Sequence, residues 1–579
     1  MKLRIWHNYQ FNAWQPNFWD VIALLLVLSV IILLAWAASQ ISTPYHLGEA
    51  LSISLNPKYL PRYALRSIFR ILTGLFLSLA FTFVVGSAAA KNKHIERIAI
   101  PLIDILQSIP VLGYLSITIV IFIYLFPNSL WGPEWASIFM IFTAQAWNMC
   151  LGFYQSIKTI PYDLREASAM FQLSAWQRFW RLEVPFAMPS LMWNSMMSMS
   201  ASWFFLVASE ALTVNKQSIL LPGIGSYIGA AILNSNILAV GYAITAMLIV
   251  ILLFDQLLFR PLLSWSEKFK VESTASEKTA KPLLVRLLVK THWLQNVVGA
   301  WFNAFCDAVV NFKITRRVKK FEHTQPMMNR SATILIYTWY ITIATSSIIL
   351  IYFLMRFIFH VISTHEILHI LLLGVYTSAR VIILIALASA VWVPIGVWIG
   401  LRPRATHIAQ PIAQFFAAFP ANLFFAIVVI VILKYHLNVN IWTTPLMILG
   451  TQWYILFNVI AGTTALPKDL VMVSQNLGLK KWLWWKRFIL PGIFPYFITG
   501  AITAAGGAWN ASIVAEVVSW GNHTLVADGL GAYIKQFTAL GDFPRIALGI
   551  SMMCVYVLIF NRLIWQPLYN LAEKRFQIN

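Results

Sequence analysis

Long apolar segments alternate with short polar ones along all 579 residues of the chain. About 20 consecutive apolar residues make an α-helix long enough to cross the hydrocarbon core of a bilayer. Lipid offers no partner to backbone N–H and C=O groups, so such segments are helical. The pattern predicts about twelve transmembrane helices in two sets of six, at 19–38, 67–90, 98–126, 135–157, 190–212 and 237–262, and at 332–358, 370–400, 408–433, 442–463, 495–518 and 543–566.

The composition strengthens this interpretation, since 59% of the residues are hydrophobic and only 11% are charged. A soluble domain carries about 25% charged residues and could not hide this much apolar surface. The three cysteines lie far apart in the sequence and suggest no disulfide framework. We therefore expect an all-α polytopic membrane protein. Its first apolar segment lacks a signal-peptide cleavage site and is expected to remain as an uncleaved first span.

The distribution of positive charge predicts the orientation. With both termini in the cytoplasm, 30 of the 42 Lys and Arg residues fall in cytoplasmic segments and eight in external loops. The opposite orientation would invert this bias, which contradicts the positive-inside rule. We expect a multi-pass protein of a bacterial inner membrane with both termini inside. The net charge of +21 then needs no nucleic-acid partner.

A polar, basic stretch separates the two sets of apolar segments. It predicts a first six-span unit at 1–262, a cytoplasmic linker at 263–330 and a second six-span unit at 331–579. Within the linker, Val285 to Phe312 mixes apolar and polar residues at helical spacing, which is typical of an amphipathic helix lying in the membrane plane. The linker is either a solvated segment that fixes the topology or a lipid-binding one.

The second set of segments repeats the first. An offset of 306 aligns Trp203 with Trp509 and Glu210 with Glu516, and an offset of 310 upstream aligns Arg70 with Arg380. The same two offsets align further rare residues, namely Pro101, Pro110, Pro161, Asp163, Trp176, Gly223 and Gly225 with Pro411, Pro420, Pro467, Asp469, Trp482, Gly529 and Gly531. An even number of spans separates equivalent points, so the two units have the same orientation. We expect an axis along the membrane normal between them, with a central pathway.

The loop between the fourth and fifth spans of each unit carries the most specific motif. It reads PYDLREASAMFQLSAWQRFWRLEVPFAMPSL in the first unit and PKDLVMVSQNLGLKKWLWWKRFILPGIFPYF in the second. An initial Pro, an early acidic residue and an amphipathic run predict a short helix outside the bilayer. Both loops resemble the E-A-A…G…L-P loop of permease subunits in type I ATP-binding-cassette importers. The resemblance implies that each loop docks on an ATPase subunit and couples ATP hydrolysis to movement of the spans.

The resemblance assigns ATPase-coupling roles to Asp163, Glu166, Ala167, Gln172, Leu173 and Trp176 in the first loop, and to Asp469, Met472, Leu477, Gly478 and Trp482 in the second. Each loop departs from the family pattern differently. The first has Gln172 in place of the family's Gly. The second keeps Gly478 but has Met472 and Val473 in place of Glu and Ala. We therefore expect unequal coupling at the two contacts.

The segments WFFLVASEAL…GIGSYI and WNASIVAEVV…GLGAYI resemble permeases for nitrate, sulfonate, taurine and bicarbonate. This resemblance implies a small anionic substrate, two ATPase subunits that bind ATP and Mg²⁺, and a substrate-binding protein on the outer side. The chain itself contains no Gly-Lys dipeptide, so the P-loop pattern G-x-x-x-x-G-K-[ST] is absent. We expect no cofactor and no hydrolase activity in this chain.

The candidate pathway residues are Arg70, Arg380, Trp203, Trp509, Glu210 and Glu516. An Arg inside a membrane is costly, which favours a contact with protein or water over one with lipid. Arg70 and Arg380 could attract an anion or form structural pairs with carboxylates, and the Trp residues could form a gate or sit at the membrane interface. We expect the Arg to contact the Glu of its own unit, directly or through one water, in at least one unit, and to keep N–H donors for an anion.

Two alternative functions remain open. A twelve-span secondary transporter not driven by ATP also has duplicated six-span halves. The segment His365-Glu366-Ile367-Leu368-His369 fits the H-E-x-x-H pattern of zinc proteases. No third ligand motif follows it, so we expect no metal site there.

Overall fold

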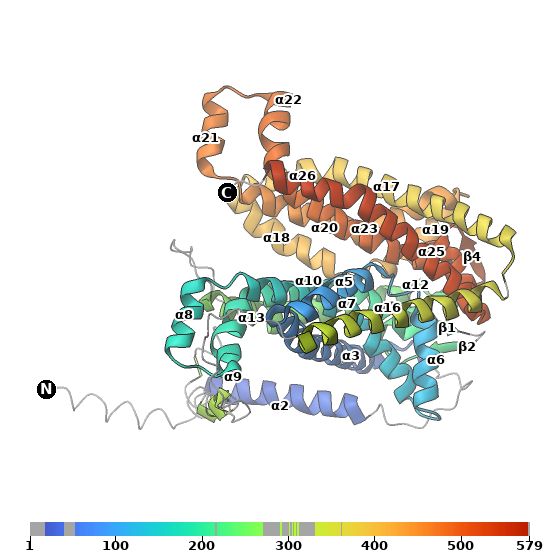
Figure 1. Cartoon of the computed structure of the whole chain (residues 1–579). Helices are drawn as coiled ribbons and strands as arrows, with labels where there is room; N and C mark the ends of the chain where they lie inside the picture. The colour runs from blue at the N-terminus through green and yellow to red at the C-terminus, as the bar shows by residue number, and fades with distance from the viewer. Residues whose placement is uncertain are drawn as a thin grey trace.

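The computed structural model describes residues 18–39, 53–214, 217–269, 330–360 and 362–576, with a few isolated positions between 290 and 311. These residues form long helices and two short β-hairpins. Most of the first unit, in blue and green, forms one layer, and most of the second unit, in yellow to red, forms another layer that lies against it (Figure 1). The yellow-green helix Arg330–Phe359 is the exception, since it lies at the level of the first unit. Most of the predicted linker helix Val285 to Phe312 lies outside the described residues.

The described part of the first unit contains twelve α-helices, and single π-helical turns join some neighbouring pairs into longer helices. They are α2 (Phe18–Ser39), α3 (Leu60–Phe81), α4 (Ser87–Lys91), α5 (Lys93–Ser108), α6 (Leu115–Leu125), α7 (Trp131–Lys158), α8 (Tyr162–Met170), α9 (Ala175–Arg178), α10 (Val184–Glu210), α11 (Ile224–Leu233) and α12 (Ile237–Phe254), followed by α13 (Arg260–Ser266) at its end. The strands β1 (Ala211–Val214) and β2 (Gln217–Leu220) lie between α10 and α11.

The second unit repeats this order. It contains α16 (Arg330–Phe359), α17 (Thr364–Gly400), α18 (Pro403–Ala418), α19 (Asn422–Lys434), α20 (Val439–Thr464), α21 (Lys468–Asn476), α22 (Lys481–Trp484), α23 (Leu490–Ala515), β3 (Val517–Trp520), β4 (His523–Val526), α24 (Leu530–Leu540), α25 (Phe543–Phe560) and α26 (Gln566–Phe576). In the described part of the chain, eight helices are long and apolar enough to cross a membrane, or nine if the bent pair α18–α19 is one span. The helical fold and the repeat are confirmed, and the count of twelve spans stays a prediction.

The third span of each unit is broken, so the single helices expected at 98–126 and 408–433 are wrong. Helices α5 and α6 are separated at Pro110, and α18 and α19 at Pro420. In the second unit the two parts are bent by 79°. Proline lacks an N–H and disfavours helical geometry in the residue before it. Accordingly Ile109 and Phe419 are extended, with ψ of 124° and 125°.

The fifth spans end earlier than the expected limits of 212 and 518. Helix α10 ends at Glu210 and α23 at Ala515, and an antiparallel β-hairpin follows each of these helices. In the first hairpin Ala211 pairs with Leu220. The β-hairpins had no distinct signal in the hydrophobic pattern because four-residue strands are too short to show a period.

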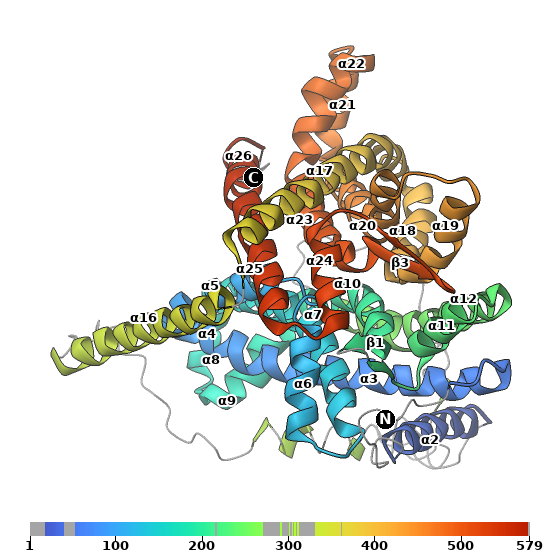
Figure 2. The same ribbon diagram turned by 90° about the vertical axis from the view of Figure 1, so that its right-hand side faces the viewer.

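The elements sort to two opposite ends of the molecule. The short helices α8 and α9, and α21 and α22, project at the end where α13 and α26 also lie, whereas the β-hairpins lie at the other end (Figure 1). The view turned by 90° shows the hairpin end, with β1 and β3 near the middle of the molecule (Figure 2). The two loops that resemble coupling loops thus lie on the same side.

The two broken spans pack into each other's units. Phe419 and Leu423 of the second unit belong to the apolar core around α3, α7 and α10 of the first. Leu112 and Leu115 of the first unit belong to the core around α23 and α25 of the second. This reciprocal burial is what a two-fold axis between parallel repeats requires.

Candidate functional site

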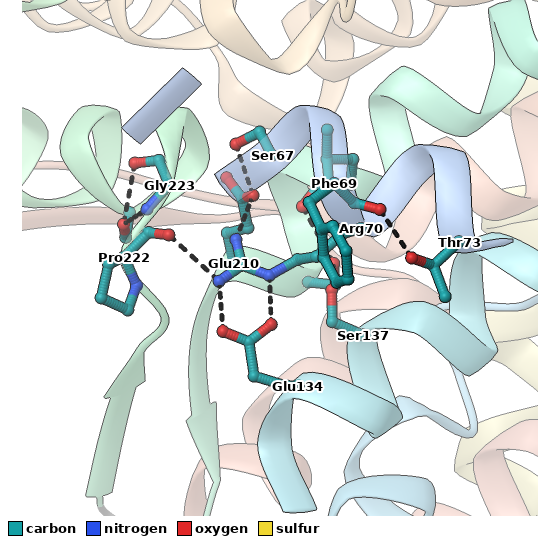
Figure 3. A network of polar contacts seen from close by, with 12 residues as sticks. Ser67, Phe69, Arg70, Thr73, Glu134, Ser137, Glu210, Pro222 and Gly223 are labelled. Atoms are coloured by element: carbon teal, nitrogen blue, oxygen red, sulfur yellow. Dashed lines mark hydrogen bonds and ion pairs between the residues drawn. The ribbon is translucent and has the colours of Figure 1, made fainter. Parts of the chain in front are cut away.

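A buried arginine joins three helices of the first unit near the hairpin end. The Arg70 side chain on α3 is 1% exposed and lies between Glu134 of α7 and Glu210 of α10 (Figure 3). Its Nε and Nη2 donate to Glu134 Oε2 and Oε1 at 2.6 and 2.7 Å. Its Nη1 donates to Glu210 Oε1 at 2.6 Å. The planar guanidinium thus makes the two-pronged contact with a carboxylate that a lysine could not make.

Glu210 also anchors the turn that follows the β-hairpin. Its Oε2 accepts a hydrogen bond from Gly225 N at 2.6 Å, and its Oε1 accepts one from Ser67 Oγ at 2.6 Å. A Cβ on Gly223 would lie 2.3 Å from the Glu210 carboxyl carbon, so only glycine allows this approach. The carboxylate therefore connects α3, α10 and the start of α11.

The second unit contains the equivalent site. Arg380 Nη1 donates to Glu516 Oε1 at 2.8 Å, and Thr377 Oγ1 donates to the same oxygen at 2.9 Å. Ala532 N donates to Glu516 Oε2 at 3.0 Å. A Cβ on Gly529 would lie 2.2 Å from Glu516 Oε2, so this glycine too is required by the close approach of a carboxylate.

The two sites differ most in the group that the fourth span places on the arginine. Under the offset of 306, Glu134 aligns with Asn440, which contacts Arg380 through its backbone oxygen at 3.3 Å and its Oδ1 at 3.2 Å. Asn440 Nδ2 also donates to Asp528 Oδ2 at 3.0 Å. Arg70 thus faces two carboxylates directly, whereas Arg380 faces one carboxylate and one amide.

The contact between the Arg and the Glu of the same unit, expected in at least one unit, is present in both. The expected free donors are scarcer, because Arg70 makes four hydrogen bonds, the fourth to Pro222 O at 3.0 Å, out of five possible N–H donors. Sequence reasoning missed Glu134 and Asn440, and also Ser67 and Thr377. Extending the two repeat offsets to polar positions would have indicated them.

The two tryptophans of the fifth spans lie inside their own units. Trp203 is 1% exposed and packs edge-on against Phe254 of α12, with ring centroids 5.1 Å apart. Trp509 packs in the same manner against Phe560 of α25 at 5.7 Å. The structure thus joins each Trp to the sixth span of its own unit, and a gating role remains a prediction.

The loop glycine position has the same backbone conformation in both units. Gly478 has a φ of +63°, and Gln172, its equivalent, has a φ of +49°. This left-handed region costs an L-residue about 1–2 kcal/mol but is open to glycine. The family's glycine at this position is therefore explained by the turn between the two short helices, which the first loop makes despite its glutamine.

Apolar side chains are exposed on both loops. The equivalent residues Phe171 and Leu477 are 78% and 69% exposed, and Met170 and Trp482 are also exposed. Asp163 and Glu166 in the first loop and Asp469 and Met472 in the second are exposed on the short helices. Ala167, Leu173 and Trp176 are half-buried, and the Trp176 ring contacts Phe179 and Trp180.

The glutamate of the H-E-x-x-H segment takes part in an ion pair. Glu366 lies in the first turn of α17, where its carboxylate pairs with Arg545 at 2.7 Å and accepts a hydrogen bond from Tyr533 at 2.9 Å. Among the described residues, no group of three His, Cys, Asp or Glu side chains could hold a metal ion. The acidic residue of the motif therefore serves an ion pair between α17 and α25.

The sequence was compared with known protein families and with curated proteins. The profile of a family described as "Binding-protein-dependent transport system inner membrane component" matches twice, at residues 82–260 and 392–565, which together make up more than half of the chain. The chain is 29% identical over 136 residues to a bicarbonate transport system permease protein of Synechocystis. It is 26% identical over 190 residues to a nitrate import permease protein of the same organism, and 23% identical over 188 residues to a probable ABC transporter permease protein of Brucella melitensis.

These matches cover only part of each protein. The first covers 24% of this chain and 47% of the bicarbonate permease, the second 33% and 64% of the nitrate permease, and the third 32% and 71% of the Brucella protein. The chain thus spans about half the length of the first of these relatives.

Proposed function

This chain belongs to the family of binding-protein-dependent transport system inner membrane components and carries the family's domain twice, and from that premise we propose that it is the complete membrane permease of an ATP-driven importer for a small anion. One chain supplies both permease halves. Transport proceeds by alternating access of a pathway between the two units. ATP and Mg²⁺ bind to separate ATPase subunits, and this chain hydrolyses nothing itself.

The observation that carries the proposal is the pair of projecting loops. Helices α8 and α21 occupy equivalent positions and lie at the same end of the molecule (Figure 1). Their tips expose Phe171 and Leu477. Exposure of these apolar side chains to water is unfavourable, and their burial in an apolar groove of a partner would be favourable. Two equivalent apolar tips on one side provide docking points for two ATPase subunits, and that side is then the cytoplasmic one, with both termini inside.

The opposite end then faces the substrate supply. The two β-hairpins and the short helices α11 and α24 lie there (Figure 2). A binding protein that delivers substrate would dock on this face. The bicarbonate and nitrate permeases named above carry small oxyanions by their names, and we extend that class of substrate to this chain.

Purification of the chain with its ATPase partner tests the proposal. We expect one copy of this chain with two ATPase subunits by mass measurement, and ATP-dependent uptake of nitrate or bicarbonate in proteoliposomes. Uptake that needs no ATPase would instead support a secondary transporter, and two copies of the chain in one complex would contradict the complete-permease proposal.

A charge on the loop tips tests the docking surface. Phe171→Asp and Leu477→Asp should each lower the amount of ATPase that co-purifies, and the two together should abolish it, because a carboxylate cannot enter an apolar groove without a large desolvation cost. Val526→Asp is the matched control, since Val526 is an exposed apolar residue on the hairpin at the opposite end. Loss of the ATPase with Val526→Asp, or its retention with both tip variants, would contradict the docking.

A further inference from the structure

A cavity of about 50 Å³ lies where the two units meet. Its walls come from Ser200 and Phe204 on α10 of the first unit and from the broken third span, the fourth span and the fifth span of the second. In the part of the chain that the structure describes, none of the lining residues carries a charge. Polar groups enter the wall at Ser200, Thr451, Tyr454 and Asn510.

Asn510 has the most specific contacts among these polar residues. Its Oδ1 accepts a hydrogen bond at 2.7 Å from the backbone N–H of Val111, at the break in the third span of the other unit. Its Nδ2 donates to Gly506 O of its own helix at 3.1 Å. An amide nitrogen has two N–H groups, so one hydrogen bond within the helix does not use up this donor.

Ser200 and Thr451 differ from Asn510 in how they use their donors. Each hydroxyl donates to a backbone oxygen one turn earlier in its own helix, Met196 O and Met447 O respectively. Their single O–H is therefore used, and they present acceptor lone pairs to the cavity. An anion needs hydrogen-bond donors, and of these three side chains Asn510 is the one with an N–H left to donate.

The repeat does not reproduce this chemistry. The equivalent of Asn510 in the first unit is Phe204, whose side chain is apolar and whose backbone oxygen accepts a weak hydrogen bond from Asn422 Nδ2 at 3.5 Å. The two-fold arrangement of the helices thus holds a polar group on one side of the interface and an aromatic ring on the other.

We propose that this cavity holds the substrate anion on its way through the membrane, and that Asn510 determines its specificity. The inference rests on the proposed function. The ligand is a small, planar, singly charged oxyanion such as nitrate or bicarbonate. An oxygen of the anion replaces Asn510 Oδ1 as the acceptor of the Val111 N–H, and Asn510 Nδ2 donates to a second oxygen.

The neutral wall sets the charge of the ligand. Removing an ion from water costs several kcal/mol even after relaxation, and the cost rises steeply with its charge. Neutral donors and apolar rings can offset part of this cost for one negative charge, whereas sulfate would need a cation that the wall lacks. Weak binding by neutral groups also suits a site that the substrate must leave.

Occupancy of the cavity is linked to separation of the units. While Asn510 accepts from Val111, the fifth span of the second unit is tied to the third span of the first. Once the anion takes over that N–H, the tie is released, and the two units can move apart. Substrate at this point therefore favours the open pathway.

The test uses Asn510→Leu, with Asn422→Leu as the matched control. Both residues are asparagines with a hydrogen bond across the interface, but only Asn510 lines the cavity. Asn510→Leu should weaken nitrate binding and uptake by about tenfold or more, since a hydrogen bond to a charged group contributes about 1.5–3 kcal/mol. Asn422→Leu should change both by less than about twofold, and Asn510→Gln, which keeps the amide, should recover part of the loss.

Two measurements separate this inference from the proposed function. Line broadening of isotopically labelled nitrate reports binding to the purified chain without any ATPase, and proteoliposome uptake reports ATP-driven transport, each with sulfate as competitor. Nitrate binding that Asn510→Leu abolishes supports the site, even where ATP drives no uptake and the proposed function fails. Two results overturn the site and leave the proposed function standing. In one, Asn510→Leu leaves ATP-driven uptake unchanged. In the other, unlabelled sulfate inhibits the uptake of labelled nitrate as strongly as unlabelled nitrate does.

Discussion

Arg70 and Arg380 are buried charges that the protein has compensated with local acceptors. A lone ion in such a place would cost several kcal/mol, and both guanidinium groups are therefore surrounded by carboxylate, amide and backbone oxygens. Arg70 makes four hydrogen bonds and Arg380 three, which favours a structural role for both, namely to fix the second span against the fifth. The fourth span also takes part in both units, through the Glu134 carboxylate in the first and through Asn440 in the second.

Removing the cation should be far more damaging than neutralising one carboxylate. We expect Arg70→Met to lower the free energy of unfolding by about 3–5 kcal/mol, because Glu134 and Glu210 would remain buried without a cation. Glu134→Gln should be milder, since Arg70 keeps Glu210 and the amide oxygen still accepts. Thermal unfolding of the purified chain in detergent measures both changes. Arg545→Met is the control, because the Arg545–Glu366 pair is partly exposed and should contribute less; a loss as large as that of Arg70→Met would contradict the argument.

The left-handed turn between the two short helices of each projecting loop gives opposite predictions for the two units. Gln172→Gly should stabilise the first loop by about 1–2 kcal/mol, because it removes the cost of a φ of +49° in a residue with a Cβ. Gly478→Ala should destabilise the second loop by a similar amount. A Cβ on Gly478 would meet nothing within 4 Å, so this cost comes from the backbone alone. Hydrogen exchange of the loop amides measures both, and equal protection in all variants would show that the turn is not rigid.

At the scale of elements, the two short helices of each loop have the same form but not the same surface. Glu166 on α8 is replaced by Met472 on α21, and both side chains are exposed. A carboxylate can accept charge-assisted hydrogen bonds from a partner, and a thioether cannot do so comparably. The two loops are thus alike in backbone and unequal in chemistry.

This inequality should appear in the kinetics of coupled transport. Glu166→Ala should lower transport-coupled ATP hydrolysis more than Met472→Ala, with the fold intact. The measurement is substrate-stimulated ATP hydrolysis in proteoliposomes, with co-purification of the ATPase as the check on assembly. Equal effects would indicate that the missing carboxylate is compensated elsewhere.

The ion pair between Glu96 and Lys158 should make the stability of the first unit depend on pH. Glu96 on α5 accepts hydrogen bonds from Lys158 Nζ at 2.7 Å and from Tyr154 Oη at 2.6 Å, and these donors hold the pKa of its carboxyl below its ordinary value of 4.5. A lowered pKa means that the contribution to stability is complete above the ordinary pKa and is lost as the pH falls through the lowered value. Glu96→Gln should therefore lower the unfolding temperature at neutral pH, and the difference from the unchanged chain should vanish in acid. A difference that persists in acid would show that packing, and not charge, is lost.

At the scale of the whole molecule, two kinds of contact join the units: the broken third span of each packs into the core of the other, and their hairpin ends touch. Each broken third span buries apolar residues in the other unit. At the hairpin end, Gly521 N between β3 and β4 donates to Ile232 O of α11 at 2.9 Å, which joins the second unit to the first. Movement between the units must loosen both kinds of contact.

Gly521 should be more sensitive to substitution than Gly478, although both have a positive φ. A Cβ on Gly521 would lie 2.2 Å from Ser235 Oγ, so Gly521→Ala adds a clash across the interface to the backbone cost of about 1–2 kcal/mol. We expect a larger fall in the unfolding temperature than for Gly478→Ala. Gly521→Ala combined with Ser235→Gly should recover the part due to the clash. Equal effects of Gly521→Ala and Gly478→Ala would contradict a tight contact at this point.

The sequence by itself determined the features that depend on the order and spacing of residues. Apolar length indicated a helical membrane protein, and paired positions such as Trp203 with Trp509 showed the repeat, because rare residues do not stay in register by chance over such a distance. The loop pattern located α8 and α21, and the repeat located both members of the Arg70–Glu210 and Arg380–Glu516 pairs.

Only the tertiary structure decided which groups meet. The breaks at Pro110 and Pro420 were hidden in continuous apolar runs, since a membrane segment looks the same whether its helix is straight or bent by 79°. Glu134 lies 64 residues from Arg70 in sequence, and Asn510 lies 399 residues from Val111, so neither contact leaves a local signal. Hydrophobic periodicity reports which face of a helix is apolar, but the partner of a buried charge or amide depends on how distant helices pack.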